Sequence, residues 1–121
     1  MATSESTINY ILDQIISLNG ARARKMFGEY ALYCSSTDGQ EKVVALVCDN
    51  ELFVKITEQG KQFVGDKYEE GFPYPGAKPA MLISGDLIED RRFICELISI
   101  TADSLPAPKP KLKKKSKAKK F

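Results

Sequence analysis

Three short apolar runs follow one another in the first half of the sequence, and their close spacing constrains the fold more than any other feature. Each run is rich in the aromatic and β-branched residues that favour strands. The runs are residues 27–34, 43–48 and 52–57. Asp38-Gly39 and Asp49-Asn50 are turn signals between them. Since parallel pairing would need a crossover of about a dozen or more residues, the sequence predicts an antiparallel three-stranded meander.

Helical periodicity is present on both sides of this meander. Apolar residues recur every three to four positions in residues 4–19 and in residues 90–104, as expected when one helix face packs on a core. A shorter helix is predicted to begin at Thr57 and end near Val64, and residues 80–84 are predicted to form a further strand. The order helix, three strands, helix, strand, helix predicts a two-layer α+β protein. Its helices are expected on one face of an antiparallel sheet.

The charges divide the chain into two parts of opposite sign. Eight of its 18 lysine and arginine residues lie in the last sixteen positions, where there is no acid. Residues 1–105 hold the other ten basic residues and all 16 acids, a net charge of −6, whereas residues 106–121 carry +8. Because they contain three prolines and few apolar residues, residues 106–121 are predicted to be disordered, and residues 1–105 to form one folded domain. The eight lysines of this lysine-rich segment are Lys109, Lys111, Lys113, Lys114, Lys115, Lys117, Lys119 and Lys120.

The lysine-rich segment has three physical interpretations. Charge runs of this kind can act simply as solvated surface that keeps a protein soluble. Lysines at this density also attract nucleic acid without sequence preference, and eight phosphate contacts would give log K a slope against log salt of at most about −7. A membrane surface is a third polyanion, but no lipidation signal or amphipathic anchor accompanies the lysines. We expect no membrane association and keep solubility and nucleic-acid contact as alternatives.

The residue inventory argues against most kinds of catalysis. The sequence has no histidine, which excludes Ser-His-Asp and Cys-His arrangements and removes most zinc sites. Its three cysteines are widely spaced and odd in number, as in a cytoplasmic protein with reduced thiols. The loop of residues 71–79 lacks the lysine and hydroxyl positions of a phosphate-binding loop, and its prolines remove amide donors. We therefore predict no enzymatic activity, no cofactor and no metal site.

Two small groups of residues are candidates for contact with a protein partner. Arg22, Arg24 and Lys25 form a basic cluster just before the first predicted strand. Tyr74 and Lys78 lie in a loop whose prolines and glycines exclude regular structure. For the basic cluster the alternative is three solvated cations in a linker, which are common on protein surfaces.

Two further motifs carry a resemblance to a known family. They are the Met-Phe-Gly-x-Tyr signature of residues 26–30 and the Tyr-Pro-Gly loop of residues 74–76. With these motifs, residues 8–104 resemble the N-terminal domain of the TfoX/Sxy family. The resemblance implies an antiparallel α+β fold in a bacterial cytoplasmic protein that regulates natural competence together with the transcription machinery. It brings no catalytic residues.

These observations lead to two hypotheses for the function. The first is a non-enzymatic regulatory or interaction module that binds a protein partner through residues 1–105 and contacts nucleic acid with the lysine-rich segment. The alternative is a weakly specific nucleic-acid-binding protein in which that segment dominates. A cytoplasmic location is expected in either case.

Overall fold

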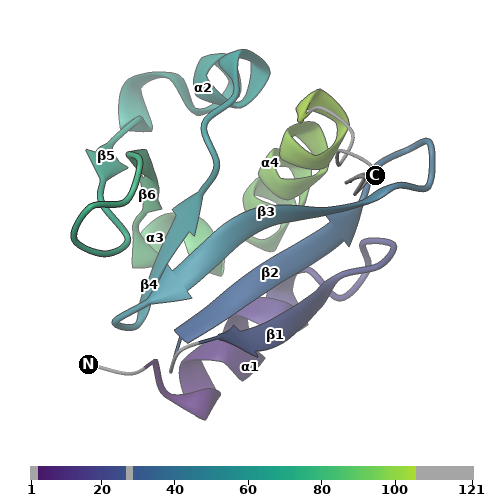
Figure 1. The fold of residues 1–121 in the computed structure, drawn as a ribbon. Coiled ribbons are helices and arrows are strands. Elements are labelled where there is room, and N and C mark those ends of the chain that lie inside the picture. The colour runs from purple at the N-terminus through teal and green to yellow at the C-terminus, as the bar shows by residue number, and fades with distance from the viewer. Residues whose placement is uncertain (1–2, 27–28, 106–121) are drawn as a thin grey trace, which may run out of the picture.

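The computed structural model describes residues 3–26 and 29–105, which are built around one six-stranded antiparallel sheet (Figure 1). The strands are β1 (Arg22–Met26), β2 (Glu29–Ser35), β3 (Glu41–Cys48), β4 (Glu51–Val54), β5 (Glu70–Gly71) and β6 (Ala80–Ile83). Across the sheet their order is β1-β2-β3-β4-β6-β5, so the predicted meander forms its centre. The lysine-rich segment and two residues of the family signature, Phe27 and Gly28, lie outside the described residues.

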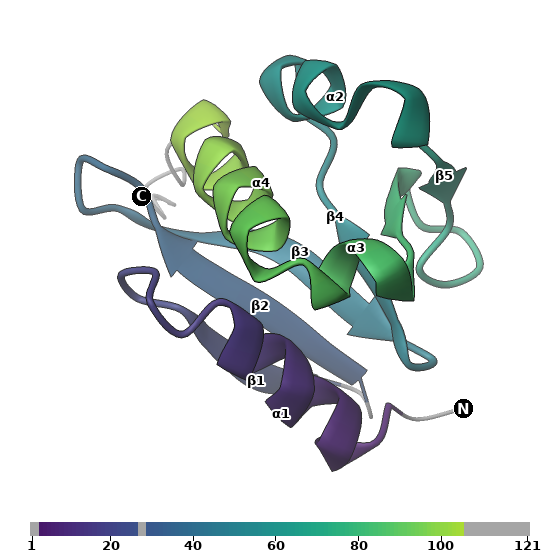
Figure 2. The same cartoon turned by 180° about the vertical axis from the view of Figure 1, so that it is seen from behind.

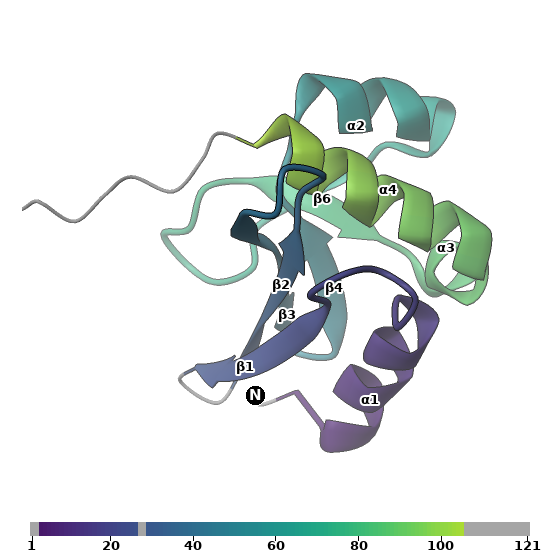
Figure 3. The same ribbon diagram turned by 90° about the vertical axis from the view of Figure 1, so that its right-hand side faces the viewer.

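In the described part of the chain four α-helices cover one face of the sheet, as the views from behind and from the side show (Figures 2 and 3). They are α1 (Glu5–Gln14), α2 (Glu58–Val64), α3 (Gly85–Glu89) and α4 (Arg91–Ser104). A single 3-10 turn, η1 (Gly65–Lys67), follows α2. The predicted class, an α+β fold with an antiparallel sheet and helices on one face, is confirmed. Among the described residues no helix is long and apolar enough to cross a bilayer.

Side-chain caps explain where three of the helices begin. The side chain of Ser4 caps α1, and Thr57 Oγ1 accepts a hydrogen bond from the Gly60 N–H at 2.9 Å at the start of α2. Asp90 Oδ1 accepts from the Phe93 N–H at 3.2 Å at the start of α4. Each cap satisfies an amide that has no partner within its helix. The helix starts predicted near residues 4, 57 and 90 are therefore confirmed.

The main hydrophobic core lies between the helices and the sheet face that they cover. Because successive strand residues point to opposite faces, alternate residues of the central strands enter this core. Complete burial of each large aliphatic side chain contributes about 1.5–3 kcal/mol. The largest fully buried apolar side chains are Ile11, Ile15, Leu32, Leu52, Met81, Ile94, Leu97 and Ile98.

Strand β1 is the main departure from the predicted order. Its basic residues were expected to precede the first strand, because Arg-Ala-Arg-Lys shows no apolar alternation. In the structure they form a strand that pairs with β2, from Arg22 opposite Tyr33 to Met26 opposite Glu29. The two-residue strand β5 and the short helix α3 were also not predicted. The observed order is one helix, four strands, one helix, two strands and two helices.

The first helix is shorter than predicted. Residues 4–19 were expected to be helical, but α1 ends at Gln14. The Ile15 N–H is shared between the carbonyl oxygens of Ile11 and Leu12 at 3.3 and 3.2 Å, which is typical of a helix that tightens at its end. Gly20 follows with a φ of +73°, so the predicted helix stop instead leads the chain into β1.

Candidate functional site

The sheet face away from the helices, here called the open face, carries a continuous band of side chains. Arg24 of β1 stands opposite Ala31, Ala31 opposite Leu46, Leu46 opposite Phe53, and Phe53 opposite Leu82. Residues paired in this way point to the same face of the sheet. The band therefore begins with a cation on the edge strand and continues with apolar side chains across four more strands, of which Leu46 and Leu82 are half-buried and the others buried.

The loop between β5 and β6 lies on the open side of the sheet (Figure 3). At its tip the Ala77 N–H donates to the carbonyl oxygen of Tyr74 at 3.0 Å, and Gly76 has a φ of +84°. Proline at the second position and a positive φ at the third define a type II turn. The Tyr-Pro-Gly sequence thus holds the loop in a defined shape above the strands.

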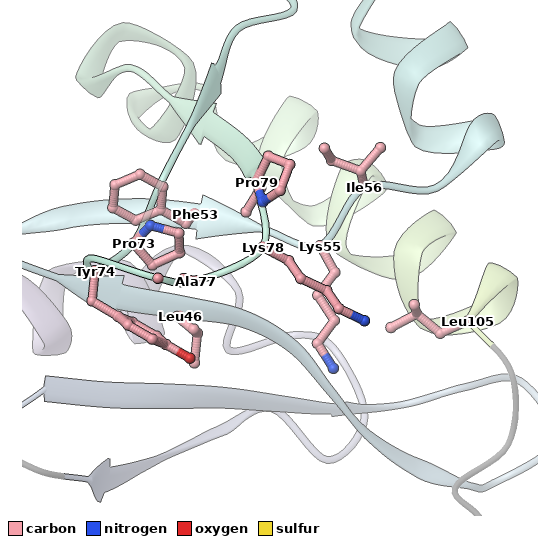
Figure 4. A pocket seen from close by; sticks show the side chains of 12 residues that line it. Leu46, Phe53, Lys55, Ile56, Pro73, Tyr74, Ala77, Lys78, Pro79 and Leu105 are labelled. Carbon is pink, nitrogen blue, oxygen red and sulfur yellow. The ribbon is translucent and has the colours of Figure 1, made fainter.

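A cavity of about 560 Å³, here called the loop cavity, lies between this loop and the strands below it (Figure 4). Its wall is mostly apolar and includes Phe53 and Leu105. The charged side chains that line it are Lys55 and Lys78, and no described carboxylate is among its lining residues. In Figure 4 both lysine side chains extend toward the end of the cavity where Leu105 lies. The loop cavity therefore combines an apolar wall with a positive end.

The two lysines of the loop cavity have no acidic partner within the part of the chain that the structure describes. Partial desolvation by the surrounding protein lowers the pKa of the Lys55 ammonium group from its ordinary value. Much of the Lys55 side chain still contacts solvent, so this desolvation is incomplete. An anion bound beside the Lys55 ammonium group would offset this desolvation, because an opposite charge favours the charged form.

A second hollow of about 460 Å³ adjoins the loop cavity and reaches the edge of the sheet. It shares Leu46, Pro73 and Tyr74 with the loop cavity and extends to Met26 of β1. Phe72, Tyr74 and Met26 are 66%, 55% and 45% exposed, which is high for large apolar side chains. Exposed apolar groups gathered beside charged residues are typical of a contact surface for another protein.

Arg22, one of the predicted partner-binding residues, makes its contacts within the sheet itself. Its Nε and Nη2 donate to Oε2 and Oε1 of Glu41 at 2.7 and 3.0 Å, and its guanidinium lies 4.3 Å from the centroid of the Tyr33 ring. The hydrogen bond from Arg22 holds the pKa of Glu41 below its usual value. These contacts connect β1 to β3 across β2. Since both charged groups are exposed, the ion pair itself adds little to stability.

Arg24 and Lys25 are exposed and, among the described residues, form no ion pair. They leave β1 on opposite sides, with Arg24 on the open face and Lys25 on the helix side opposite Tyr30. β1 is the first strand of the sheet, so one of its sides has no neighbouring strand in the described chain. Such an edge presents main-chain N–H and C=O groups that are available for pairing.

The structure thus divides the predicted partner-binding residues between two places. Arg22, Arg24 and Lys25 lie on the β1 edge, whereas Tyr74 and Lys78 line the loop cavity. The eight lysines predicted to contact nucleic acid lie outside the described residues. Lys55 was not predicted as a site residue. The available signal was its position two residues after Phe53, which places both side chains on one face of an extended segment.

The sequence comparison identifies the family of this fold. Residues 13–104 match the family model of the TfoX N-terminal domain, a span that runs from within α1 to the end of α4. The chain belongs to the TfoX N-terminal domain family. A Spirochaeta aurantia relative described as "Uncharacterized 12.7 kDa protein in trpE 5'region" is 41% identical over 111 residues, which cover 92% of this chain and 90% of that protein. The β1 edge and almost all of the loop cavity fall within the family match.

In the part of this TfoX N-terminal domain that the structure describes, two of the three cysteines are in settings that do not favour a nucleophilic thiol. Among the described residues no three His, Cys, Asp or Glu side chains are grouped as metal ligands would be. Cys34 and Cys48 are buried, and desolvation raises the pKa of both thiols. A raised pKa leaves less thiolate, which is the nucleophilic form of cysteine.

Proposed function

We propose that this TfoX N-terminal domain is a non-enzymatic interaction module that binds a protein partner through the β1 edge. The setting would be regulation of transcription or of competence, as the family resemblance implies. The partner segment would be extended and would carry acidic side chains. The family is not known for catalysis, which agrees with a role in binding.

The exposed basic edge strand is the observation that supports this proposal. A segment of the partner adds to β1 as a new strand, so that main-chain hydrogen bonds supply affinity and alternate side chains supply specificity. Arg24 and Lys25 point to opposite faces, and acidic residues at successive positions of the added strand would meet both. Cations on an edge also oppose pairing with a second copy of the chain, because like charges would face each other.

Partner capture with charge-reversed protein tests this proposal. The full chain, an Arg24→Glu/Lys25→Glu variant and a Lys67→Glu/Arg92→Glu control are immobilised and exposed to an extract of the native cell. Both variants carry the same change in net charge, but Lys67 and Arg92 are exposed residues away from β1. We expect a protein that the wild type and the control retain and the β1 variant loses.

Hydrogen exchange then locates the contact. The captured protein, once purified, should slow exchange of the β1 amides in the wild type, because a new strand would occupy them. Equal capture by both variants, or protection confined to the helices, would contradict the proposal. So would the absence of any protein bound in a charge-dependent way.

A second candidate function is contact with nucleic acid through the lysine-rich segment. The sequence supports it, because eight lysines without an intervening acid attract a polyanion. Under this alternative the folded part of the chain, with its net charge of −6, adds no affinity for nucleic acid. A salt titration of DNA binding separates this function from the first proposal.

A further inference from the structure

The loop cavity has a charge pattern that the rest of the folded domain does not lead one to expect. Residues 1–105 hold 16 acids and ten basic residues, yet the charged groups that line this cavity are two lysines. Among the described residues neither lysine forms an ion pair. No described carboxylate lines the cavity beside these two ammonium groups, so an anion bound there would balance their charge.

We infer that the loop cavity binds a small organic anion, with its carboxylate or phosphate group against Lys55 and Lys78 and its aromatic or aliphatic body on the apolar wall. The inference goes beyond the partner-binding proposal, because the ligand is a small molecule and no β1 residue lines this cavity. An experiment can therefore contradict the anion-binding inference without contradicting the partner-binding proposal, and the reverse also holds.

The shape of the loop cavity fits this class of ligand. Its volume of about 560 Å³ is within the range of sites that hold small molecules. The ring of Phe53 and the side chain of Leu46 come from the band on the open face, and Pro73 and Tyr74 come from the loop above them (Figure 4). A flat apolar body between these two layers would be covered on both sides. A small polar anion such as inorganic phosphate would contact the two lysines but would leave the apolar wall without a contact.

The position of the lysines sets the orientation of the ligand. Lys55 follows β4 in the chain and Lys78 belongs to the loop, so the anionic group would connect the sheet to the loop that covers it. In Figure 4 both side chains extend toward the same end of the cavity, beside Leu105. The lowered pKa of Lys55 agrees with this role, because a bound anion would return that pKa toward its ordinary value.

Two fluorescent probes that differ in one group test the inference. Anilinonaphthalene sulfonate carries an aromatic body with an anionic group, and phenylnaphthylamine has the same body without the sulfonate. Each is titrated into the full chain at low salt. We expect saturable binding of one sulfonate probe per chain and about five- to tenfold weaker binding of the neutral probe, since it lacks contacts to two lysines that are each worth up to about 1 kcal/mol.

Three variants connect the binding to the two lysines. Lys55→Gln and Lys78→Gln should each weaken the sulfonate probe about two- to fivefold, and together about tenfold, with little effect on the neutral probe. Lys67→Gln, an exposed lysine of η1, is the matched control and should change neither. Near-ultraviolet circular dichroism checks that each variant is folded, because the sulfonate probe also binds loosened proteins.

Amide chemical shifts locate the probe and decide between outcomes. When the sulfonate probe is added, we expect changes in the amide chemical shifts of Ile56, Ala77 and neighbouring residues of the cavity, and no changes in α1. A third substitution, Ala77→Phe, fills the cavity from the loop and should weaken both probes. Shifts centred elsewhere, equal affinity of the charged and neutral probes, or unchanged affinity in the double lysine variant would each overturn the inference. Displacement by phenylacetate or by phenyl phosphate then distinguishes a carboxylate ligand from a phosphate ligand.

Discussion

The ammonium group of Lys42 closes the C-terminal end of α4. Only 8% of this residue is exposed, and its Nζ donates to the carbonyl oxygens of Ala102 and Leu105 at 2.7 Å each. These carbonyls belong to the last turn of the helix and the residue after it, which have few partners within the helix. Lys42 therefore joins β3 to α4 by satisfying polar groups that would otherwise be buried and unpaired.

Replacing Lys42 with methionine should destabilise the fold. Lys42→Met keeps much of the aliphatic stem but leaves the two carbonyl oxygens without their donor, and we expect a loss of about 1–3 kcal/mol in the free energy of unfolding. Urea denaturation measures this loss. Lys67→Met, in the exposed turn η1, is the control and should change the value by less than about 0.5 kcal/mol. Similar losses in the two variants would show that the contacts of Lys42 do not stabilise the domain.

Interactions between residues close in the sequence could be predicted from it, whereas interactions between distant residues could not. The caps at Thr57 and Asp90 were predictable, because a capping side chain bonds to an amide three residues further along. The burial of Lys42 was not, since a lysine near a strand start is expected to face solvent. Its partners lie about sixty residues away, and only the packing of α4 on β3 brings them together.

The loop between β5 and β6 depends on one backbone conformation. Gly76 has a φ of +84° in its type II turn, and a Cβ added there would meet nothing within 4 Å. Gly85 at the start of α3 also has free space for a Cβ, but its φ is not positive. An added Cβ would clash at neither glycine, so a comparison of the two isolates the cost of the left-handed backbone at Gly76.

Substitution of these two glycines should give opposite results. Gly76→Ala should lower the free energy of unfolding by about 1–2 kcal/mol, because an L side chain is strained at positive φ. Gly85→Ala should be neutral or stabilise by up to about 1 kcal/mol, because it restricts the unfolded chain without strain. Thermal and urea unfolding of both variants measure the difference. Equal shifts in stability would mean that the turn conformation is not fixed by Gly76.

Elements with their own periodic pattern were predictable, and elements that depend on a neighbour were not. The meander and α4 follow from alternation and helical spacing within their own sequences. β1 has no such pattern, because four of its five residues are exposed and three are basic. Its extended conformation comes from pairing with β2. The candidate edge was therefore recognised as a basic cluster but not as a strand.

At the scale of the whole molecule, the sequence predicts the layers better than the surfaces they create. Short connections forced an antiparallel sheet, and the amphipathic helices had to cover one face of it. The loop cavity has no comparable signal, because its wall combines residues from Leu46 to Leu105. The Tyr-Pro-Gly turn indicated a defined loop, but not that this loop would fold back over the open face. Lys55 and Lys78 are brought to one cavity only by that return.

The division of charge along the chain predicts how binding to DNA should depend on salt. If the lysine-rich segment contacts nucleic acid, its eight cations act against a folded part with a net charge of −6, which should itself be repelled by phosphates. Affinity for labelled duplex DNA should then fall steeply with salt between about 50 and 200 mM, with a slope of log K as steep as about −7. Two unrelated DNA sequences should give the same slope, since phosphate contacts carry no sequence information.

A full-length variant in which all eight of these lysines are glutamine provides the comparison. Fluorescence anisotropy should show that it loses nearly all affinity, because charge supplies most non-specific binding. The Arg24→Glu/Lys25→Glu variant should bind DNA with almost the same slope as the wild type, since we propose that β1 binds a protein partner. If the glutamine variant instead kept the wild-type affinity and the β1 variant lost it, the phosphates would contact the edge strand. The β1 edge would then be a nucleic-acid surface and not a site for an acidic peptide, because Arg24 and Lys25 would supply the contacts to phosphate.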